Sequence, residues 1–210
     1  APTNPGQAVV DYDGTGNVSS GLVAKQKFGV KFTKAGTYQY FCIIHPLMKG
    51  SITVVDSGTT DVQSAIDARG KAIYDPALAA LKGIATANKA KPLASAPKTG
   101  GGTKFSLIVS GETDKGDVQQ FFPEKVTVKA GDAIEWKTDN HTPHSVTFGP
   151  LVVGPMDDPT EIPSSRPAAT YDGTGIWHSG MLGIDWPGGL TWEMTFSKPG
   201  TYTYVCILHA

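Results

Sequence analysis

A duplicated segment constrains this chain more than any other feature of its sequence. Residues 12–22 read YDGTGNVSSGL, and residues 171–181 read YDGTGIWHSGM. Residues 32–45 read FTKAGTYQYFCIIH, and residues 196–209 read FSKPGTYTYVCILH. The offset grows from 159 to 164 residues between these matches, so the second copy carries five extra residues. A repeat of this length indicates that one structural unit is built twice.

The two copies differ in the segments that surround them. Four segments with the alternating pattern of β-strands precede the second copy: Lys104–Ser110, Lys125–Val128, Ala133–Lys137 and His144–Phe148. The first copy has no such segments before it, but a predicted strand, Ser51–Val55, follows it. We therefore predict three regions. Residues 1–57 are the C-terminal half of a first unit, residues 58–102 are a connector, and residues 103–210 are a second unit without its last strand.

The connector has the pattern of a helical spacer followed by a flexible linker. Apolar residues recur at close to helical spacing over Asp61–Tyr74, although Gly70 weakens the pattern. Asp75 and Pro76 predict the start of a second helix, with Asp75 as its cap. Residues 91–102, KPLASAPKTGGG, predict a flexible linker. We expect the helical part to pack on a neighbouring sheet, and a helix that binds a partner is the alternative.

The rest of the chain has the composition of an all-β protein. Its 210 residues include 25 Gly and 15 Pro, and short alternating segments lie between turns, which predicts a small sandwich or barrel. Lys and Arg number 18 against 19 Asp and Glu, a balance that argues against nucleic-acid binding. No apolar run approaches the roughly 20 residues of a membrane-spanning helix, so we predict no transmembrane segment in this chain.

The most specific chemical signal is the spacing Cys42-x-x-His45-x-x-Met48 at the end of a predicted strand. Thiolate and thioether sulfur suit Cu⁺, whereas imidazole and thiolate suit Cu²⁺, so this donor set predicts copper in both oxidation states. Zinc is less favoured, because neither Cys has a second Cys nearby and Met is a poor zinc ligand. The second copy repeats the pair as Cys206-x-x-His209.

A site with two His and one Cys needs another histidine from elsewhere in the chain. The five histidines are His45, His141, His144, His178 and His209. His144 opens a predicted strand after a turn, so its side chain can face the same end of the sandwich as Cys206, and we choose it as the upstream ligand. We interpret His141 as a solvated turn residue and His178 as exposed or packed near Trp177.

At this point the sequence resembles a known family. The stretches KAGDAIEWKTDNHTPHSVTF, GTYTYVCILH and GTYQYFCIIHPLMKGSITV resemble the blue-copper proteins, or cupredoxins, above all the plastocyanin, amicyanin, halocyanin and auracyanin group. The resemblance implies Greek-key β-sandwich units with copper at one end. It also implies an extracytoplasmic carrier that exchanges single electrons with protein redox partners, for which a membrane electron-transfer complex is one candidate.

The family pattern of His, Cys, His and Met implies two copper sites in this chain. Its implied ligands are His144, Cys206 and His209 in the second unit, and Cys42, His45 and Met48 in the first. The first unit has no His before Cys42, and the second has no Met after His209. Three explanations stay open: the chain is a piece of a longer protein, other chains supply the missing strands, or one site has decayed while the other binds copper with three ligands.

Two further functions compete with an electron carrier. A structural or assembly subunit is the main alternative, because tandem units with unfinished edges suit strand complementation between chains. A multicopper oxidase or copper nitrite reductase is less favoured. By resemblance, those enzymes hold a further copper cluster with His-x-His pairs and a His beside the Cys, and this sequence has neither. We therefore predict that the protein is not an enzyme.

Overall fold

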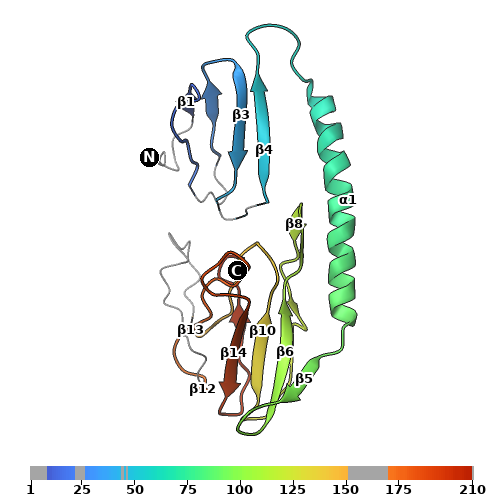
Figure 1. Cartoon of the computed structure of the whole chain (residues 1–210), viewed down its shortest axis with the longest axis vertical. Helices are drawn as coiled ribbons and strands as arrows, with labels where there is room; N and C mark the ends of the chain where they lie inside the picture. Colours follow the sequence, from blue (N-terminus) through green and yellow to red (C-terminus); the bar gives the residue numbers. More distant parts are fainter. Residues whose placement is uncertain (1–8, 22–26, 44, 46, 151–169, 210) are drawn as a thin grey trace. The chain divides into compact units, whose positions relative to one another are not determined.

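The computed structural model describes residues 9–21, 27–43, 45, 47–150 and 170–209 (Figure 1). The chain divides into two compact units, one formed by Ala1–Phe41 and Lys49–Gly70 and the other by Cys42–Met48 and Lys71–Ala210. One helix and otherwise only strands make up the regular elements of the described residues, which confirms the all-β prediction.

The described residues of the first unit form two strand pairs. Strand β1 (Val10–Tyr12) pairs in parallel with β2 (Val30–Phe32), and β3 (Gly36–Phe41) pairs antiparallel with β4 (Lys49–Val54) (Figure 1). Strand β4 contains most of the strand predicted after the first copy. The rings of Tyr12, Phe32 and Tyr38 pack together, with centroids between 4.5 and 6.3 Å apart. None of the described residues of this unit is buried.

The connector forms one helix, α1 (Gln63–Ala90), where the sequence predicts two. Pro76 lies inside it, although an interior proline removes one backbone hydrogen bond and its ring crowds the preceding turn. The predicted stripe of Leu81, Ile84 and their neighbours is partly covered, whereas Ile66 and Ile73 of the earlier stripe are exposed. Within the described part of the chain, no helix combines the length and apolar character needed to cross a membrane.

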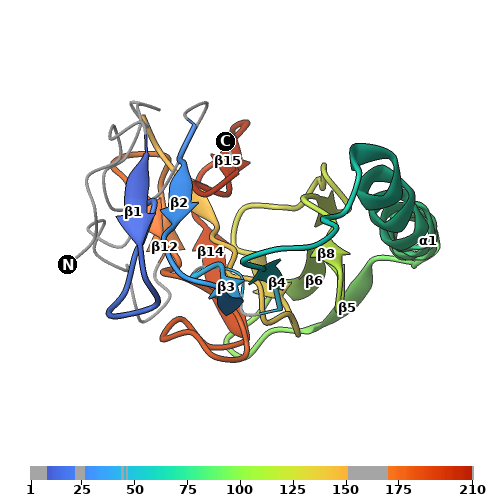
Figure 2. The same ribbon diagram turned by 90° about the horizontal axis from the view of Figure 1, so that it is seen from above.

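The second unit is a two-layered β-sandwich. One sheet has the order β12-β14-β10-β6-β5, with β9 also paired to β6, and the other has the order β13-β11-β15. The strands of the first sheet are β5 (Ala94–Pro97), β6 (Thr103–Val109), β9 (Phe121–Phe122), β10 (Ala133–Lys137), β12 (Thr170–Tyr171) and β14 (Thr191–Phe196). Those of the second are β11 (Thr147–Phe148), β13 (Trp177–His178) and β15 (Tyr204–Val205). Seen from above, β15 and β14 lie in separate layers (Figure 2).

Aromatic residues from both sheets fill the space between the layers. Trp136 of β10 packs against Trp192 of β14 and against Phe148 of β11, with ring centroids 5.5 and 5.7 Å apart. The alternation along β14 is regular, since Trp192, Met194 and Phe196 are buried and the residues between them are not. Full burial of such a side chain stabilises the fold by about 1.5–3 kcal/mol, so this core holds the sandwich together.

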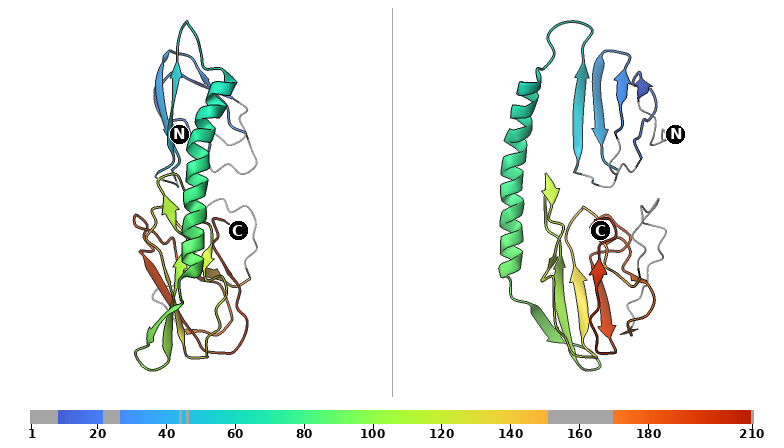
Figure 3. Two further views of the ribbon diagram at one scale, coloured as in Figure 1. Left: turned by 90° about the vertical axis from the view of Figure 1, so that its right-hand side faces the viewer. Right: turned by 180° about the vertical axis from the view of Figure 1, so that it is seen from behind.

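Two segments differ from their sequence-based predictions. Ala94–Pro97, inside the predicted flexible linker, forms β5 and pairs antiparallel with β6, as the rear view shows (Figure 3). Pro97 is tolerated because β5 is an edge strand. The predicted strand Lys125–Val128 has no strand partner among the described residues, although Val126 and Val128 still pack against the core. Alternation predicts which side chains face inward, but pairing also requires a neighbouring strand.

Candidate metal centre

His144 enters the second unit through a short backbone bridge. Its N–H donates to the carbonyl of Leu182 at 3.0 Å, and the N–H of Leu182 donates to the carbonyl of His144 at 2.7 Å. The His144 side chain is only 2% exposed. Both its backbone and its ring are therefore held in place by the sandwich.

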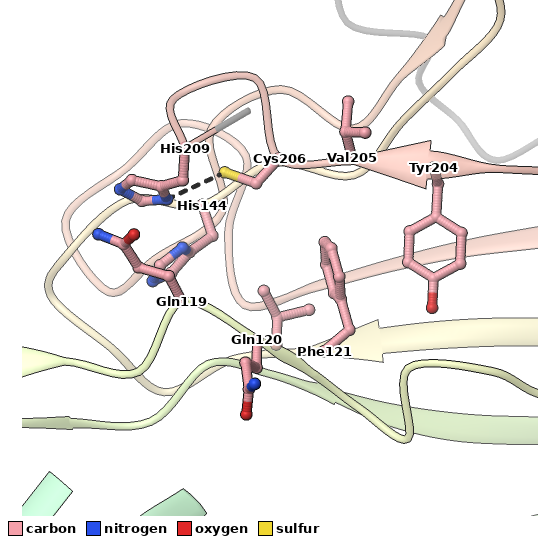
Figure 4. A pocket seen from close by; sticks show the side chains of 9 residues that line it. Gln119, Gln120, Phe121, His144, Tyr204, Val205, Cys206 and His209 are labelled. Atoms are coloured by element: carbon pink, nitrogen blue, oxygen red, sulfur yellow. Dashed lines mark hydrogen bonds between the residues drawn. The ribbon is translucent and has the colours of Figure 1, made fainter.

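Cys206 and His209 reach the same point from the end of β15. The N–H of His209 donates to the carbonyl of Cys206 at 3.1 Å, which closes a turn, and Cys206 Sγ lies 3.4 Å from His209 Nδ1. The rings of His144 and His209 have centroids 5.1 Å apart. One ligand atom from each of the three residues lies within 4.8 Å of the other two (Figure 4).

Ser145 ties the two sides of this site together, and sequence reasoning missed it. Its N–H donates to Cys206 Sγ at 3.3 Å, and its Oγ accepts the N–H of Ile207 at 3.0 Å. Because Ser145 directly follows His144 in the sequence, it could have been predicted to lie beside the site. A hydrogen bond to the sulfur is one of the contacts that tune a metal thiolate.

Burial shifts the proton affinities of all three residues. It lowers the pKa of His144 to about 3, and it also lowers the pKa of His209. Both imidazoles are therefore neutral at pH 7, with a lone pair free to bind a metal. Burial raises the pKa of the Cys206 thiol, so a metal that binds its sulfur must displace a proton.

A cavity of about 220 Å³ adjoins the three residues. Val109, Phe121 and Tyr204 form its apolar side, and Gln119 lies near the histidines (Figure 4). His144 is buried, and Cys206 and His209 are partly buried. Two neutral imidazoles and one thiol form a donor set that suits a transition metal and above all copper. The residues at this end of the sandwich therefore fit the copper that the sequence predicts.

The first copy builds a similar turn with a different environment. Cys42 Sγ lies 3.2 Å from His45 Nδ1, and the N–H of Met48 donates to the carbonyl of His45 at 2.9 Å. The Met48 side chain is 62% exposed. Among the described residues, the group of His144, Cys206 and His209 is the one set of three His, Cys, Asp or Glu donors close enough to share an ion.

The remaining histidines lie outside this group. His141 is partly exposed, as expected of a turn residue, and its Nδ1 lies 2.8 Å from Asp185 Oδ2. His178 is buried rather than exposed. It lies in β13, which pairs with β11. Its Nδ1 lies 2.8 Å from the hydroxyl of Thr147.

The fold and the site together define a copper-binding β-sandwich. The plastocyanin/azurin family of copper-binding proteins matches residues 107–210. A plastocyanin from Dryopteris crassirhizoma is 31% identical over 90 residues, which span 43% of this chain and 76% of that protein. No solved structure matches. The chain belongs to the plastocyanin/azurin family of copper-binding proteins, and copper is its cofactor.

Proposed function

We propose that this protein is a blue-copper electron carrier whose copper is held by His144, Cys206 and His209. The observation that carries the proposal is the convergence of one thiol and two neutral imidazoles within 4.8 Å at one end of the sandwich. A bound copper ion would supply the Cu⁺/Cu²⁺ couple, which takes up and releases one electron at a time.

The protein's contribution is to hold these donors still. The backbone bridge to Leu182 fixes His144, and Ser145 links the segment that carries His144 to the loop of Cys206. Donors held in this way move little when the charge between them changes, which favours fast electron exchange. The neighbouring Val109, Phe121 and Tyr204 limit the access of water.

An electron carrier explains this site better than an enzyme does. Neither Val205 nor Ile207, the neighbours of Cys206, can ligate a second metal. In the described part of the chain, no second group of three His, Cys, Asp or Glu donors lies close enough together to hold another ion. The partners that we propose are redox proteins, and the location that we propose is extracytoplasmic.

Copper titration of the full chain tests the proposal. We expect Cu²⁺ to produce an intense visible thiolate-to-copper band, and a reductant to remove it reversibly. Rapid electron exchange with a redox protein, without turnover of a small molecule, would support the carrier. Copper binding without the band would mean that Cys206 is not a ligand, and the proposal would fail.

A second role, assembly with other chains, has a separate observation in its favour. A groove of about 1010 Å³ in the second unit is lined mainly by segments 124–130 and 198–204. The first of these segments is outside every described sheet, and an unpaired extended edge is suited to accept a strand. A native mass spectrum with and without copper tests this role, which predicts assemblies of more than one chain.

The first copy of the repeat supplies a second proposed copper site, for which this chain names three ligands and not the fourth. We propose residues 1–57, 58–102 and 103–210 as the first half-unit, the connector and the second unit. Cys42, His45 and Met48 are the proposed copper ligands of the first. The three explanations for its fourth ligand make different predictions. A decayed site binds no copper even when other chains are added or a longer protein is used, whereas the other two explanations predict that one of these additions restores binding.

A further inference from the structure

A short hairpin braces the loop that leads to His144. Strands β7 (Glu112–Thr113) and β8 (Gly116–Asp117) pair antiparallel between β6 and β9. The Glu112 carboxylate accepts the N–H groups of His141 and of Thr142, the latter at 3.0 Å. One strand of the hairpin therefore already fixes the backbone just before His144.

The other strand of the hairpin presents Asp117 to the His144 ring. Asp117 Oδ2 lies 3.5 Å from His144 Nε2, and the two side chains are 11% and 2% exposed. Neither atom has a hydrogen-bond partner among the described residues. Buried polar atoms are nearly always paired. Each of these two atoms is close enough to serve as the hydrogen-bond partner of the other. A shift of about half an ångström would bring them to the ~2.9 Å of an ordinary hydrogen bond.

We propose that Asp117 is a positioning residue that accepts a hydrogen bond from Nε2–H of His144 and so leaves Nδ1 of that ring to bind copper. This inference rests on the proposed function. A carboxylate behind a ligating imidazole fixes the tautomer and the orientation of the ring and makes the ring a stronger donor.

The hairpin is itself supported, which lets it act as a rigid brace. Asn88 of α1 donates to the carbonyl of Ser110 at 3.4 Å, at the residue where the chain leaves β6 with a φ of 67°. A Cβ at Gly111 would lie 2.6 Å from Ile84, and one at Gly116 would lie 3.2 Å from Leu81. The later half of α1 thus packs closely on the hairpin, and Figure 1 shows β8 beside it. A precise site needs such a supporting layer.

The carboxylate has a predictable effect on the copper couple. A stronger imidazole donor and a nearby negative charge both stabilise Cu²⁺ more than Cu⁺. Replacement of a residue that supports a ligand in this way typically weakens metal binding by about 10- to 100-fold. Asp117 should therefore lower the reduction potential, and its removal should raise it.

The decisive comparison uses the copper-loaded full chain and the variants Asp117→Asn and Asp185→Asn. Asp185 is the matched control, because it also pairs with a histidine, His141, but lies at an exposed position outside the donor group. We expect Asp117→Asn to weaken Cu²⁺ binding about 10-fold relative to Cu⁺, which corresponds to a rise of about 59 mV in the potential. Asp185→Asn should change neither quantity.

A second measurement on the unmodified chain keeps the inference testable if Asp117→Asn does not fold. In the diamagnetic Cu⁺ form, the Nε2 proton of His144 should exchange slowly and be visible by NMR. A fast-exchanging Nε2 proton, or an unchanged potential in folded Asp117→Asn, would overturn the role of Asp117 while leaving the copper site intact. If the unmodified chain shows no thiolate-to-copper band, the proposed function fails first and this inference falls with it.

Discussion

The two copies of the repeat build the same local structure in two different settings. Lys34 pairs with Asp13 at 2.9 Å in the first copy, and Lys198 pairs with Asp172 at 3.1 Å in the second. The hydroxyl of Tyr38 donates to the carbonyl of Lys34, as that of Tyr202 does to the carbonyl of Lys198. The strand pairs β1–β2 and β12–β14 are both parallel. The duplicated residues therefore encode their own turns, ion pairs and strand contacts.

The surroundings of the two copies differ in burial. The first unit has no buried residue among those described, whereas the second has a continuous aromatic core. Six of the eleven buried residues of that core, and the third donor His144, lie in residues 103–148, which precede the second copy. The repeat therefore supplies a Cys–His turn and a few core residues, while the sequence outside the repeat supplies most of the core and the upstream ligand.

Substitution of the two cysteines should change the visible absorption of the copper form most strongly, and very differently for each cysteine. We expect Cys206→Ser to abolish the visible thiolate-to-copper band, because Cys206 is the only thiol close to His144 and His209 among the described residues. Cys42→Ser should leave most of that band, since Cys42 lies beside His45 but belongs to no group of three donors among the described residues. Absorption spectra of both variants after addition of Cu²⁺ make the measurement.

The double variant, with both Cys42 and Cys206 replaced by Ser, tests whether the band comes from cysteine at all. A band that survives loss of both thiols cannot arise from copper bound to cysteine in this chain. A band that disappears in Cys42→Ser alone would reverse the comparison and make the first turn the principal site.

A matched pair of phenylalanines tests the difference in burial. Phe196 and Phe32 occupy equivalent places in the repeat, but Phe196 is 6% exposed and contacts Phe148, whereas Phe32 is only half-buried against Tyr12 and Tyr38. We expect Phe196→Ala to lower the free energy of unfolding by about 3–5 kcal/mol. Phe32→Ala should lower it by less than about 1 kcal/mol. Urea unfolding followed by near-UV circular dichroism measures both, and equal losses would show that the first unit has a core of its own.

Much of this organisation was predictable from particular residues. The alternation in Lys104–Ser110 and Ala133–Lys137 predicted β6 and β10, because period two reports directly on which side chains face the core. The proximity of His144 to Cys206 was predictable, and their role as ligands stays a prediction. The predicted strand His144–Phe148 is shorter, however: β11 covers only Thr147–Phe148, and His144 forms an isolated bridge just before it. The continuous helix through Pro76 was not predictable, because the cost of a proline can be offset by the turns on either side.

The parts that sequence reasoning missed depend on contacts between distant residues. Asp117 lies 27 positions before His144, and no local pattern indicates that a two-residue strand will carry its carboxylate to that ring. The pairing of β5 with β6 likewise depends on an edge that only the folded sheet provides. Periodicity reports on one segment at a time, so it cannot reveal such supports.

Ser145 offers a smaller test, because no residue of the first copy has its position. Replacement by Ala would remove the acceptor of the Ile207 N–H but keep the backbone N–H that donates to Cys206 Sγ. We expect a loss of about 1 kcal/mol in the free energy of unfolding and a shift of the visible band without its loss. A thermal melt and a spectrum of the copper form measure these effects. Complete loss of the band would mean that the hydroxyl, rather than the N–H, holds the Cys206 loop.

The smallest expected effect concerns the carboxylates that both copies share. Hydrogen bonds from Thr174 and, to a smaller extent, from Lys198 lower the pKa of Asp172 to about 2. In the first copy, Thr15 and Lys34 likewise lower the pKa of Asp13. A carboxyl group with a lowered pKa in the folded state stabilises the fold above its ordinary pKa, and this contribution is lost as the pH falls toward the folded-state value. Asp172→Asn should therefore lower Tm slightly at pH 5 and reduce the fall in Tm between about pH 4 and pH 2.

Asp13→Asn should leave the same melting profile unchanged. The ion pair is equivalent, but none of the described residues of the first unit is buried, so they form no core that would couple a surface contact to cooperative unfolding. Melts of both variants at pH 2, 3, 4 and 5, followed by near-UV circular dichroism, make the comparison. If Asp13→Asn flattened the profile as much as Asp172→Asn, the first unit would have to unfold together with a core, and the contrast between the two copies would be lost.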